Sequence, residues 1–202
     1  MLLAMLLAAP AYAIEFRWWG IGPTFGTRIV PLQYPIYPKA ADGFDTIEGN
    51  FEAGIKTALY AGNIGRVQLR GEIGGDFSIW RSEEFTFGWD QLLVKDGELQ
   101  LLLGGQVGVG HERTFSAEGE NPYWDVQYFP IRAELGGLLR DKWRGYELDL
   151  WGAWHIVGKQ ENCASDGDCT SPADLADGVA FYAGVGVEAT IFFGSFYSAK
   201  EK

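Results

Sequence analysis

The chain has 202 residues, a length that suits one all-β domain, and 15% of them are aromatic, which excludes a disordered composition. Acidic residues outnumber basic residues by 27 to 16, so the formal net charge is −11. That charge disfavours a nucleic acid partner, whose phosphates would be repelled.

The first thirteen residues form an apolar run that ends in Ala11-Tyr12-Ala13, a small-x-small pattern typical of a cleaved export signal. The run is too short to cross a bilayer as a helix. It lacks the positive residues that open such signals, so we expect a truncated leader or a misplaced start. The alternative is that these thirteen residues form an apolar strand or helix of the folded protein. We predict a signal peptide over residues 1–13, a barrel over 14–197 and a short polar tail over 198–202.

Apolar and polar residues alternate along most of the remaining chain, with the period of two that marks a strand between two different surroundings. In residues 47–60, Phe51 and Ile55 lie on one face, and Glu52 and Lys56 lie on the other. We predict eight strands, at Glu15–Ile29, Ile47–Tyr60, Arg66–Ile79, Phe85–Val94, Glu98–Gly110, Asp125–Leu139, Tyr146–Val157 and Val179–Phe193. The triplet Gly20, Gly22 and Pro23 predicts a bulge in the first strand.

The connections between these strands alternate between short and long. Tight turns are expected at residues 61–65, 95–97 and 140–145, and longer connections at 30–46, 80–84, 111–124 and 158–178. The alternation places all tight turns and both termini at one end. This alternation of connection lengths holds only if residues 80–84 form a connection between two strands. We therefore predict an all-β fold, an eight-stranded antiparallel up-and-down barrel with no second domain.

Two barrels fit this pattern: a soluble lipocalin-like barrel with the apolar face inside, and a transmembrane barrel with that face toward lipid. The polar face combines charges of both signs with many glycines, as a narrow eight-stranded interior requires. The strands are long enough to cross a bilayer when tilted. Aromatic residues also gather at both strand ends, as at two membrane interfaces: Trp18, Trp19, Tyr60, Trp143, Tyr146, Phe192 and Phe193 near the tight turns, and Phe25, Phe77, Trp80, Phe85, Phe87, Trp124, Trp154 and Phe181 near the long loops.

These features together resemble the small bacterial outer-membrane β-barrel families of the OmpA-transmembrane-domain, OmpX and OmpW kind. The last strand, Tyr182 to Phe193, looks like the C-terminal assembly signal of such families. The resemblance is one of architecture and covers nearly all of residues 14–197. It implies the outer membrane of a Gram-negative cell as the location, and outer-membrane lipid, lipopolysaccharide and the outer-membrane assembly machinery as partners.

We expect the barrel lumen to be filled by a network of paired charges, because an isolated buried charge is costly. The predicted network consists of Arg17, Glu52, Lys56, Arg70, Glu72, Asp90, Arg132, Glu134, Glu147, Asp149 and Glu188. A plugged barrel with a structural or surface-interaction role is the favoured function. The alternatives are a narrow pore for small solutes, a lipid A-modifying enzyme and the soluble ligand-binding barrel.

Cys163 and Cys169 flank a short polar loop, and in an exported protein they predict a local disulfide. Two thiols with no histidine nearby make a poor zinc site, so no metal and no cofactor is expected. An alternative is that Asp166-Gly167-Asp168 binds a cation weakly, but this motif lacks the spacing of an EF-hand loop. The long loops would face outward and carry any recognition of a surface partner, which the sequence does not identify.

Catalysis needs a nucleophile with a base in reach, and the chain has two histidines, His111 and His155. Position 157 is Val, so the serine that follows the histidine by two residues in the lipid A deacylase pattern is missing. Ser116 and His111 lie near each other in the sequence, but this proximity is only weak evidence for a nucleophile and its base. We therefore expect no enzyme activity.

Overall fold

The computed structural model describes residues 16–30, 48–62, 64–75, 80–94, 99–115, 123–141, 143–163, 168–170 and 181–196. Within these ranges no helix is long and apolar enough to cross a membrane. The predicted signal peptide and the predicted polar tail lie outside the described residues.

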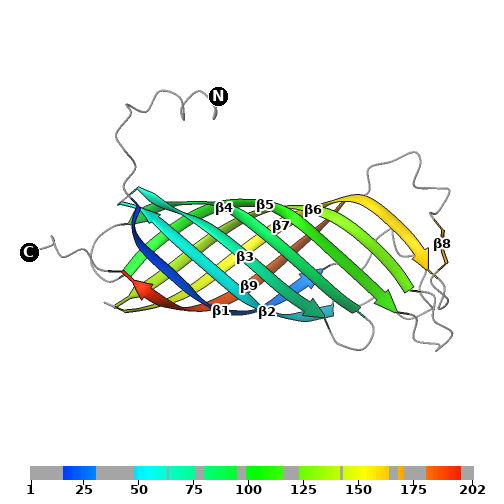
Figure 1. The fold of residues 1–202 in the computed structure, drawn as a ribbon, viewed down its shortest axis with the longest axis horizontal. Helices are drawn as coiled ribbons and strands as arrows, with labels where there is room; N and C mark the ends of the chain where they lie inside the picture. Colours follow the sequence, from blue (N-terminus) through cyan, green and yellow to red (C-terminus); the bar gives the residue numbers. More distant parts are fainter. Residues whose placement is uncertain are drawn as a thin grey trace, which may run out of the picture.

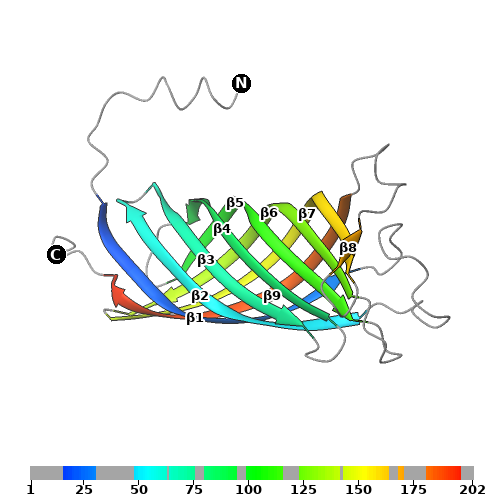
Figure 2. The same ribbon diagram turned by 45° about the vertical axis from the view of Figure 1, so that its right-hand side comes forward.

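In the described ranges the regular structure consists entirely of antiparallel strands, which form one ring of tilted strands (Figures 1 and 2). Each strand pairs with its neighbour in the chain, and β9 pairs with both β7 and β1, so eight strands close into a barrel. The strands are β1 (Phe16–Val30), β2 (Glu48–Ala61), β3 (Gly65–Gly75), β4 (Trp80–Val94), β5 (Leu99–Phe115), β6 (Tyr123–Arg140), β7 (Arg144–Cys163), the two-residue β8 (Cys169–Thr170) and β9 (Phe181–Ser195). The predicted all-β up-and-down barrel is confirmed.

The two ends of the barrel differ in their connections. The start of β1 lies beside the end of β9, with Trp19 opposite Ser195, and the short connections after β2, β4 and β6 lie at this same end. We call it the turn end. The opposite end, the loop end, carries the longer connections after β1, β5 and β7, together with the connection of four residues after β3.

The apolar face of the barrel is outside and the charged face is inside. Outward side chains such as Ile55, Leu103 and Leu150 are 58%, 51% and 56% exposed, whereas Lys56 and Asp149 on the inner face are fully buried. A water-soluble protein buries its large apolar side chains, so this exposure requires an apolar solvent around the barrel. We call the outward apolar side chains of the barrel strands the apolar belt. The soluble lipocalin-like alternative is wrong for this reason.

Three local predictions differ from the structure. Residues 80–84, predicted as a connection, belong to β4, because the chain turns between Gly75 and Trp80 instead. The strands β5 and β7 run past their predicted ends, to Phe115 and Cys163. The predicted bulge at residues 20–23 is also wrong: β1 pairs with β2 in continuous register from Trp18, and the irregularity lies between residues 16 and 18.

An internal apolar layer closes the turn end of the barrel. Its buried members are Trp18, Ala58, Tyr60, Leu92, Leu102, Leu138, Phe192 and Phe196. Tyr60 and Phe192 each meet the Phe196 ring edge-on, at centroid distances of 6.1 and 6.3 Å. Arg140 donates a hydrogen bond to the Phe196 carbonyl at 3.0 Å and holds that residue just past the end of β9. Trp18, Tyr60 and Phe192, which we predicted for the lipid interface, therefore lie inside the lumen.

Charged residues replace the apolar belt on the outer face of β4 to β7 at the loop end. Register aligns them in two rows on neighbouring strands, and we call the eight residues the polar panel: Arg81, Arg113, Asp125 and Glu161 in one row, and Glu83, His111, Gln127 and Lys159 in the other. The next outward residues toward the turn end on β4 and β5, Phe85 and Val109, are about half exposed. At about 3.4 Å per residue, the panel extends these strands roughly 10 Å beyond the apolar belt.

Candidate functional site: the charged lumen

The lumen between the apolar layer and the loop end is filled by charged side chains from every side of the barrel. All residues of the predicted network are buried there except Arg17, whose side chain lies outside the described residues. They fall into three groups along the barrel axis. These groups are built from inward positions, which alternate with the belt positions on the same strands.

The group nearest the apolar layer is built around Lys56 and Arg66. The ammonium of Lys56 donates hydrogen bonds of 2.7 Å to both Glu147 and Asp149, and lies 3.6 Å from Glu134. Arg66 holds Glu147 with two of its nitrogens and Asp90 at 2.5 Å. Strands β2 and β3 thus supply the cations, and β7 and β4 supply the carboxylates that meet them.

Two arginines share one carboxylate in the middle group. Arg70 and Arg132 donate to the same oxygen of Glu188, Oε2, at 2.8 and 2.9 Å. Arg132 also stacks on Trp151 with its guanidinium carbon 4.2 Å from the ring centroid. A cation over an aromatic face inside a desolvated space is attracted by the ring quadrupole, so Trp151 contributes to holding Arg132 in place.

Arg28, Glu84 and His155 form the group toward the loop end. Arg28 lies within 3.2 Å of Glu52 and 3.6 Å of Glu84. His155 lies edge-on to Tyr128 at 4.8 Å, and Tyr128 donates a hydrogen bond of 3.1 Å to Glu84. Because Arg70 also reaches Glu84 at 3.0 Å, this group is joined to the middle one.

Neutral amide side chains link the carboxylates of Asp90 and Glu134. Gln68 donates to both Asp90 and Glu134, and Gln106 donates to the other oxygen of Glu134. The carboxylate of Glu134 on β6 therefore accepts hydrogen bonds from side chains on β3 and β5. Charge-assisted hydrogen bonds of this kind are stronger than neutral ones.

Glycines give these large side chains their room. A β-carbon on Gly104 would lie 1.9 Å from an oxygen of Asp90, and one on Gly136 would lie 2.3 Å from an oxygen of Asp149. On the opposite wall, a β-carbon on Gly186 would lie 2.5 Å from the Trp151 ring. The glycine-rich inner face noted in the sequence is therefore what allows a narrow barrel to enclose arginines and a tryptophan.

Carboxyl groups outnumber cations in this lumen. The described buried cations are Arg28, Lys56, Arg66, Arg70 and Arg132, and the described carboxyl groups are Glu52, Glu72, Glu84, Asp90, Glu112, Glu134, Glu147, Asp149 and Glu188. Each cation reaches at least two carboxyl groups, and Lys56 reaches four within 4 Å. These contacts join side chains from different walls of the barrel.

Sequence reasoning omitted several members of this network. Glu84 and Glu112 were assigned to connections, although they continue the inward alternation of β4 and β5. Arg28 continues the inward series of Thr24 on β1 and is 1% exposed. Extending the strands around residues 80–84 and 111–115 by their own alternation would have found Glu84 and Glu112, and applying the alternation within the predicted first strand would have found Arg28. His155, predicted as an ordinary polar residue, is fully buried within the network.

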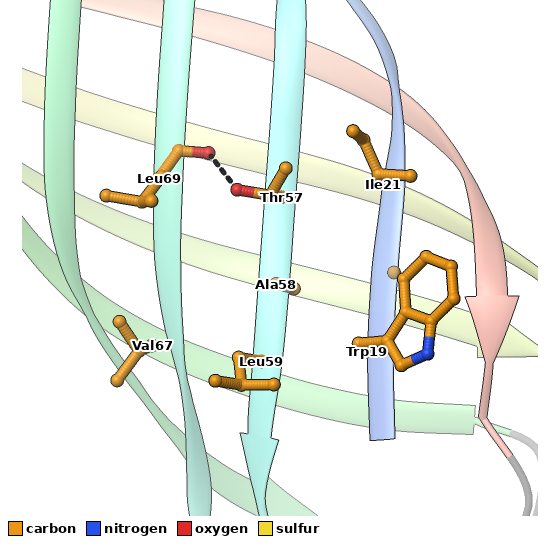
Figure 3. Close-up of a pocket in the computed structure, with 8 residues that line it drawn as sticks. Trp19, Ile21, Thr57, Ala58, Leu59, Val67 and Leu69 are labelled. Carbon is orange, nitrogen blue, oxygen red and sulfur yellow. Dashed lines mark hydrogen bonds between the residues drawn. The ribbon is translucent and has the colours of Figure 1, made fainter. Parts of the chain in front are cut away.

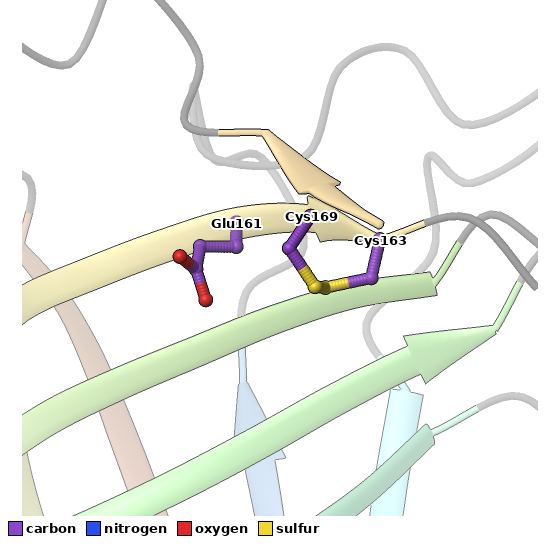
Figure 4. Close-up of side chains that lie close together, drawn as sticks. All are labelled: Glu161, Cys163 and Cys169. Atoms are coloured by element: carbon purple, nitrogen blue, oxygen red, sulfur yellow. A yellow bond between two sulfur atoms is a disulfide. The ribbon is translucent and has the colours of Figure 1, made fainter. Parts of the chain in front are cut away.

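Cys163 and Cys169 form a disulfide between β7 and β8, as predicted. Glu161 lies beside the two sulfur atoms (Figure 4), and its carboxylate is 2.8 Å from Lys159. Because both sulfurs are in the disulfide, neither is available as the thiolate that would bind a metal. Asp166 and Gly167 of the weak cation motif lie outside the described residues.

A shallow depression lies on the belt near the turn end, over β1, β2 and β3 (Figure 3). Trp19, Ile21, Leu59 and Leu69 project around the short side chain of Thr57, whose hydroxyl donates to the Leu69 carbonyl at 3.3 Å. The hydroxyl is satisfied within the sheet, so the surface offered to the surroundings is apolar.

The comparisons with known proteins concern the fold. The crystal structure of Neisserial surface protein A (NspA) superimposes with a TM-score of 0.53 and 7% sequence identity, over 87% of this chain and 96% of that one. The chain shares the closed β-barrel fold of that protein. Since the identity is 7%, the likeness extends to the fold alone.

No protein-family model matches the chain. A segment of 101 residues is 28% identical to a Cystinosin homolog of Caenorhabditis elegans, over 48% of this chain and 25% of that protein. The chain thus covers a quarter of the length of this relative. A match of that extent does not show a family.

Proposed function

We propose that the protein is an outer-membrane β-barrel with a structural or surface-interaction role, that its lumen is closed to solutes, and that its loop end faces the cell exterior. The exposed apolar belt supports residence in a bilayer, and the fold shared with NspA supports the outer membrane. Short turns face the periplasm in bacterial barrels of this type, which supports the orientation. Recognition of a surface partner then belongs to the long loops.

The main support for a closed lumen is the complete burial of cations that bridge opposite walls of the barrel. Lys56 on β2 contacts Glu147 on β7, and Arg70 on β3 contacts Glu188 on β9, with none of these side chains more than 3% exposed. A water-filled channel would leave such groups hydrated. In addition, the apolar layer seals the turn end with aromatic rings.

Planar-bilayer recording tests closure against the alternative of a narrow pore. The refolded protein should show no steady conductance steps at neutral pH, while a porin refolded and inserted in the same way shows them. A variant with Arg70→Ala and Arg132→Ala removes both arginines from Glu188, which leaves Lys56 at 3.5 Å, and should produce small steps, provided that it still shows heat-modifiable gel migration. Regular steps from the unaltered protein would overturn closure.

The proposed partners are outer-membrane lipid, lipopolysaccharide and the assembly machinery. The belt depression at Thr57 suits an acyl chain, and the polar panel lies at the level of lipid headgroups, directly above the belt. Arg81 and Arg113 lie opposite each other there, beside their partners Glu83 and Asp125, and a phosphate between the two guanidinium groups would stabilise their juxtaposition. Replacing both with Gln should lower the lipopolysaccharide that co-purifies, without changing refolding into phosphatidylcholine vesicles.

We propose no catalytic activity and no resident cofactor. His111 faces outward, 2.7 Å from Asp125, and His155 is enclosed in the lumen. Neither contacts a serine among the described residues, while Ser116 lies outside them. Mass spectrometry of lipid A from cells that produce the His111→Ala or His155→Ala variant tests this directly, because a change in acylation relative to the unaltered protein would reveal an enzyme.

A further inference from the structure

His111 and Arg113 hold the same carboxylate on the outer face of the barrel. Nε2 of His111 lies 2.7 Å from Oδ1 of Asp125, and Nε of Arg113 lies 3.1 Å from Oδ2. The histidine and the arginine are successive outward residues of β5, and Asp125 meets them from the neighbouring strand β6. Their side chains are 30% and 47% exposed, so both are accessible from outside the barrel.

The polar panel contains as many carboxylates as permanent cations. Each cation lies beside a carboxylate, at 2.7 Å for Arg81 and Glu83, 3.1 Å for Arg113 and Asp125, and 2.8 Å for Lys159 and Glu161. The panel therefore has no net charge while His111 is neutral. Histidine is the side chain that changes charge between about pH 5 and 8, so a proton on His111 makes the panel positive.

Register places His111 next to both arginines of the proposed phosphate site. Arg81 lies directly opposite Arg113, and Glu83 lies directly opposite His111. His111 is thus the diagonal neighbour of Arg81, at a distance of about 7–8 Å that long side chains bridge. A phosphate group offers several strong acceptor oxygens, and both arginines and a protonated histidine are donors. These three side chains can therefore hold one phosphate together.

We propose that His111, when protonated, is the third cationic group of a phosphate site that Arg81 and Arg113 form on the polar panel, and that this site binds the phosphate of a lipopolysaccharide headgroup more tightly in mild acid. This role rests on the proposed function, in which a headgroup phosphate lies between the two arginines. It adds the residue that makes the site respond to pH.

The shared carboxylate of Asp125 makes the proton effective. While His111 is neutral, Asp125 offsets the charge of Arg113. Once His111 is protonated, the same carboxylate faces two cations and offsets only one of them. The surplus positive charge attracts the phosphate, because opposite charges attract at this separation. The affinity therefore rises as the pH falls.

The charged groups around His111 come from three strands. They are Glu83 and, diagonally, Arg81 on β4, Arg113 on β5 itself and Asp125 on β6, and the neutral Gln127 lies opposite His111 on β6. His111 is the one histidine in this group, and histidine is the residue type that titrates between about pH 5 and 8. The pH response of the site therefore depends on this residue.

The position of the site favours a lipid headgroup over free phosphate. His111 and Glu83 come next, toward the loop end, after the outward apolar residues Val109 and Phe85, which are about half exposed. A phosphate bound here lies at the edge of the apolar belt, which is the level of the membrane interface.

Titration of a fluorescently labelled lipopolysaccharide into the barrel in phosphatidylcholine nanodiscs, between about pH 5 and 8, tests this role. The matched variant is His111→Gln, which keeps a hydrogen-bond donor for Asp125 and carries no charge. The affinity of the unaltered protein relative to His111→Gln should rise about twofold to fivefold from the neutral to the acidic end, the gain that one exposed ion pair supplies. The ratio is needed because phosphate groups themselves lose charge below about pH 6, which weakens binding to both proteins. Heat-modifiable gel migration checks that each variant is folded.

Lys159→Gln is the control for loss of any panel cation. Lys159 lies in the same row as His111 but two strands away on β7, so this variant should keep the full pH response. The same pH response in the unaltered protein and in His111→Gln would overturn the role of His111 and leave the two arginines as the site. Displacement of the probe by an equal concentration of inorganic phosphate would refute the assignment to a headgroup. Failure of lipopolysaccharide to bind at any pH would exclude the proposed partner, and this role with it.

Discussion

Replacing Lys56 with Met tests how much the lumen network stabilises the barrel. The Lys56 ammonium is fully buried and lies within 4 Å of four carboxyl groups, on Glu134, Glu147, Asp149 and Glu188. Met has a similar length and no charge, so the substitution removes the cation and leaves those groups enclosed. Breaking a buried ion pair from one side costs about 3–5 kcal/mol.

A loss of this size is large against the whole stability of a domain. It lowers the folding equilibrium constant by roughly 10²–10⁴, since about 1.4 kcal/mol corresponds to a factor of ten. The assay is urea unfolding in phospholipid vesicles, followed by tryptophan fluorescence and by heat-modifiable gel migration. The midpoint should shift to clearly lower urea.

The matched control is Arg81→Met in the polar panel. Arg81 lies 2.7 Å from Glu83, the same distance that separates Lys56 from its two nearest carboxylates, but the two panel side chains are 62% and 52% exposed. An exposed ion pair contributes about 0–1 kcal/mol because water and salt screen it. If Lys56→Met and Arg81→Met cost the same, burial of the network is not what stabilises this barrel, and the reasoning fails.

Three further predictions concern packing, lipid and the disulfide. Gly186→Ala places a β-carbon 2.5 Å from the Trp151 ring and should cost about 1–3 kcal/mol in urea unfolding, whereas Gly137→Ala meets nothing within 4 Å and should be neutral. Leu103→Arg, on the belt, should cost about 2–4 kcal/mol in lipid vesicles, and a small effect would mean that Leu103 does not face lipid. Reducing the Cys163–Cys169 disulfide, which closes a separation of six residues, should increase proteolysis after β7 and leave the gel migration of the barrel unchanged.

Residue alternation was sufficient to predict the strands and their two faces. Each strand of an antiparallel barrel carries its own pattern of two, and hairpins join neighbours in the chain, so this information is local. The same alternation already assigned Trp18, Tyr60 and Phe192 to the inner face. We predicted these three residues for the lipid interface because aromatic residues near strand ends are typical of such interfaces. The structure shows that the alternation alone gives their correct side of the barrel wall.

The ends of strands were harder to predict than their cores. Residues 80–84 contain charges that resemble a loop, yet they pair with β5 as part of β4. A strand that rises above the bilayer becomes polar on its outer face, so its pattern there no longer differs from that of a loop. The polar panel, and with it Glu84 and Glu112, was missed for this reason.

The sequence by itself determined that this chain forms a β-barrel with apolar residues on one face and charges on the other, because both properties follow from alternation within single strands. Only the tertiary structure decided which charges meet. Lys56 and Glu147 are 91 residues apart, and Arg70 and Glu188 are 118 apart. Closing the ring between β9 and β1 fixes the tilt and register of all eight strands together, and that register brings these side chains to the same depth in the lumen.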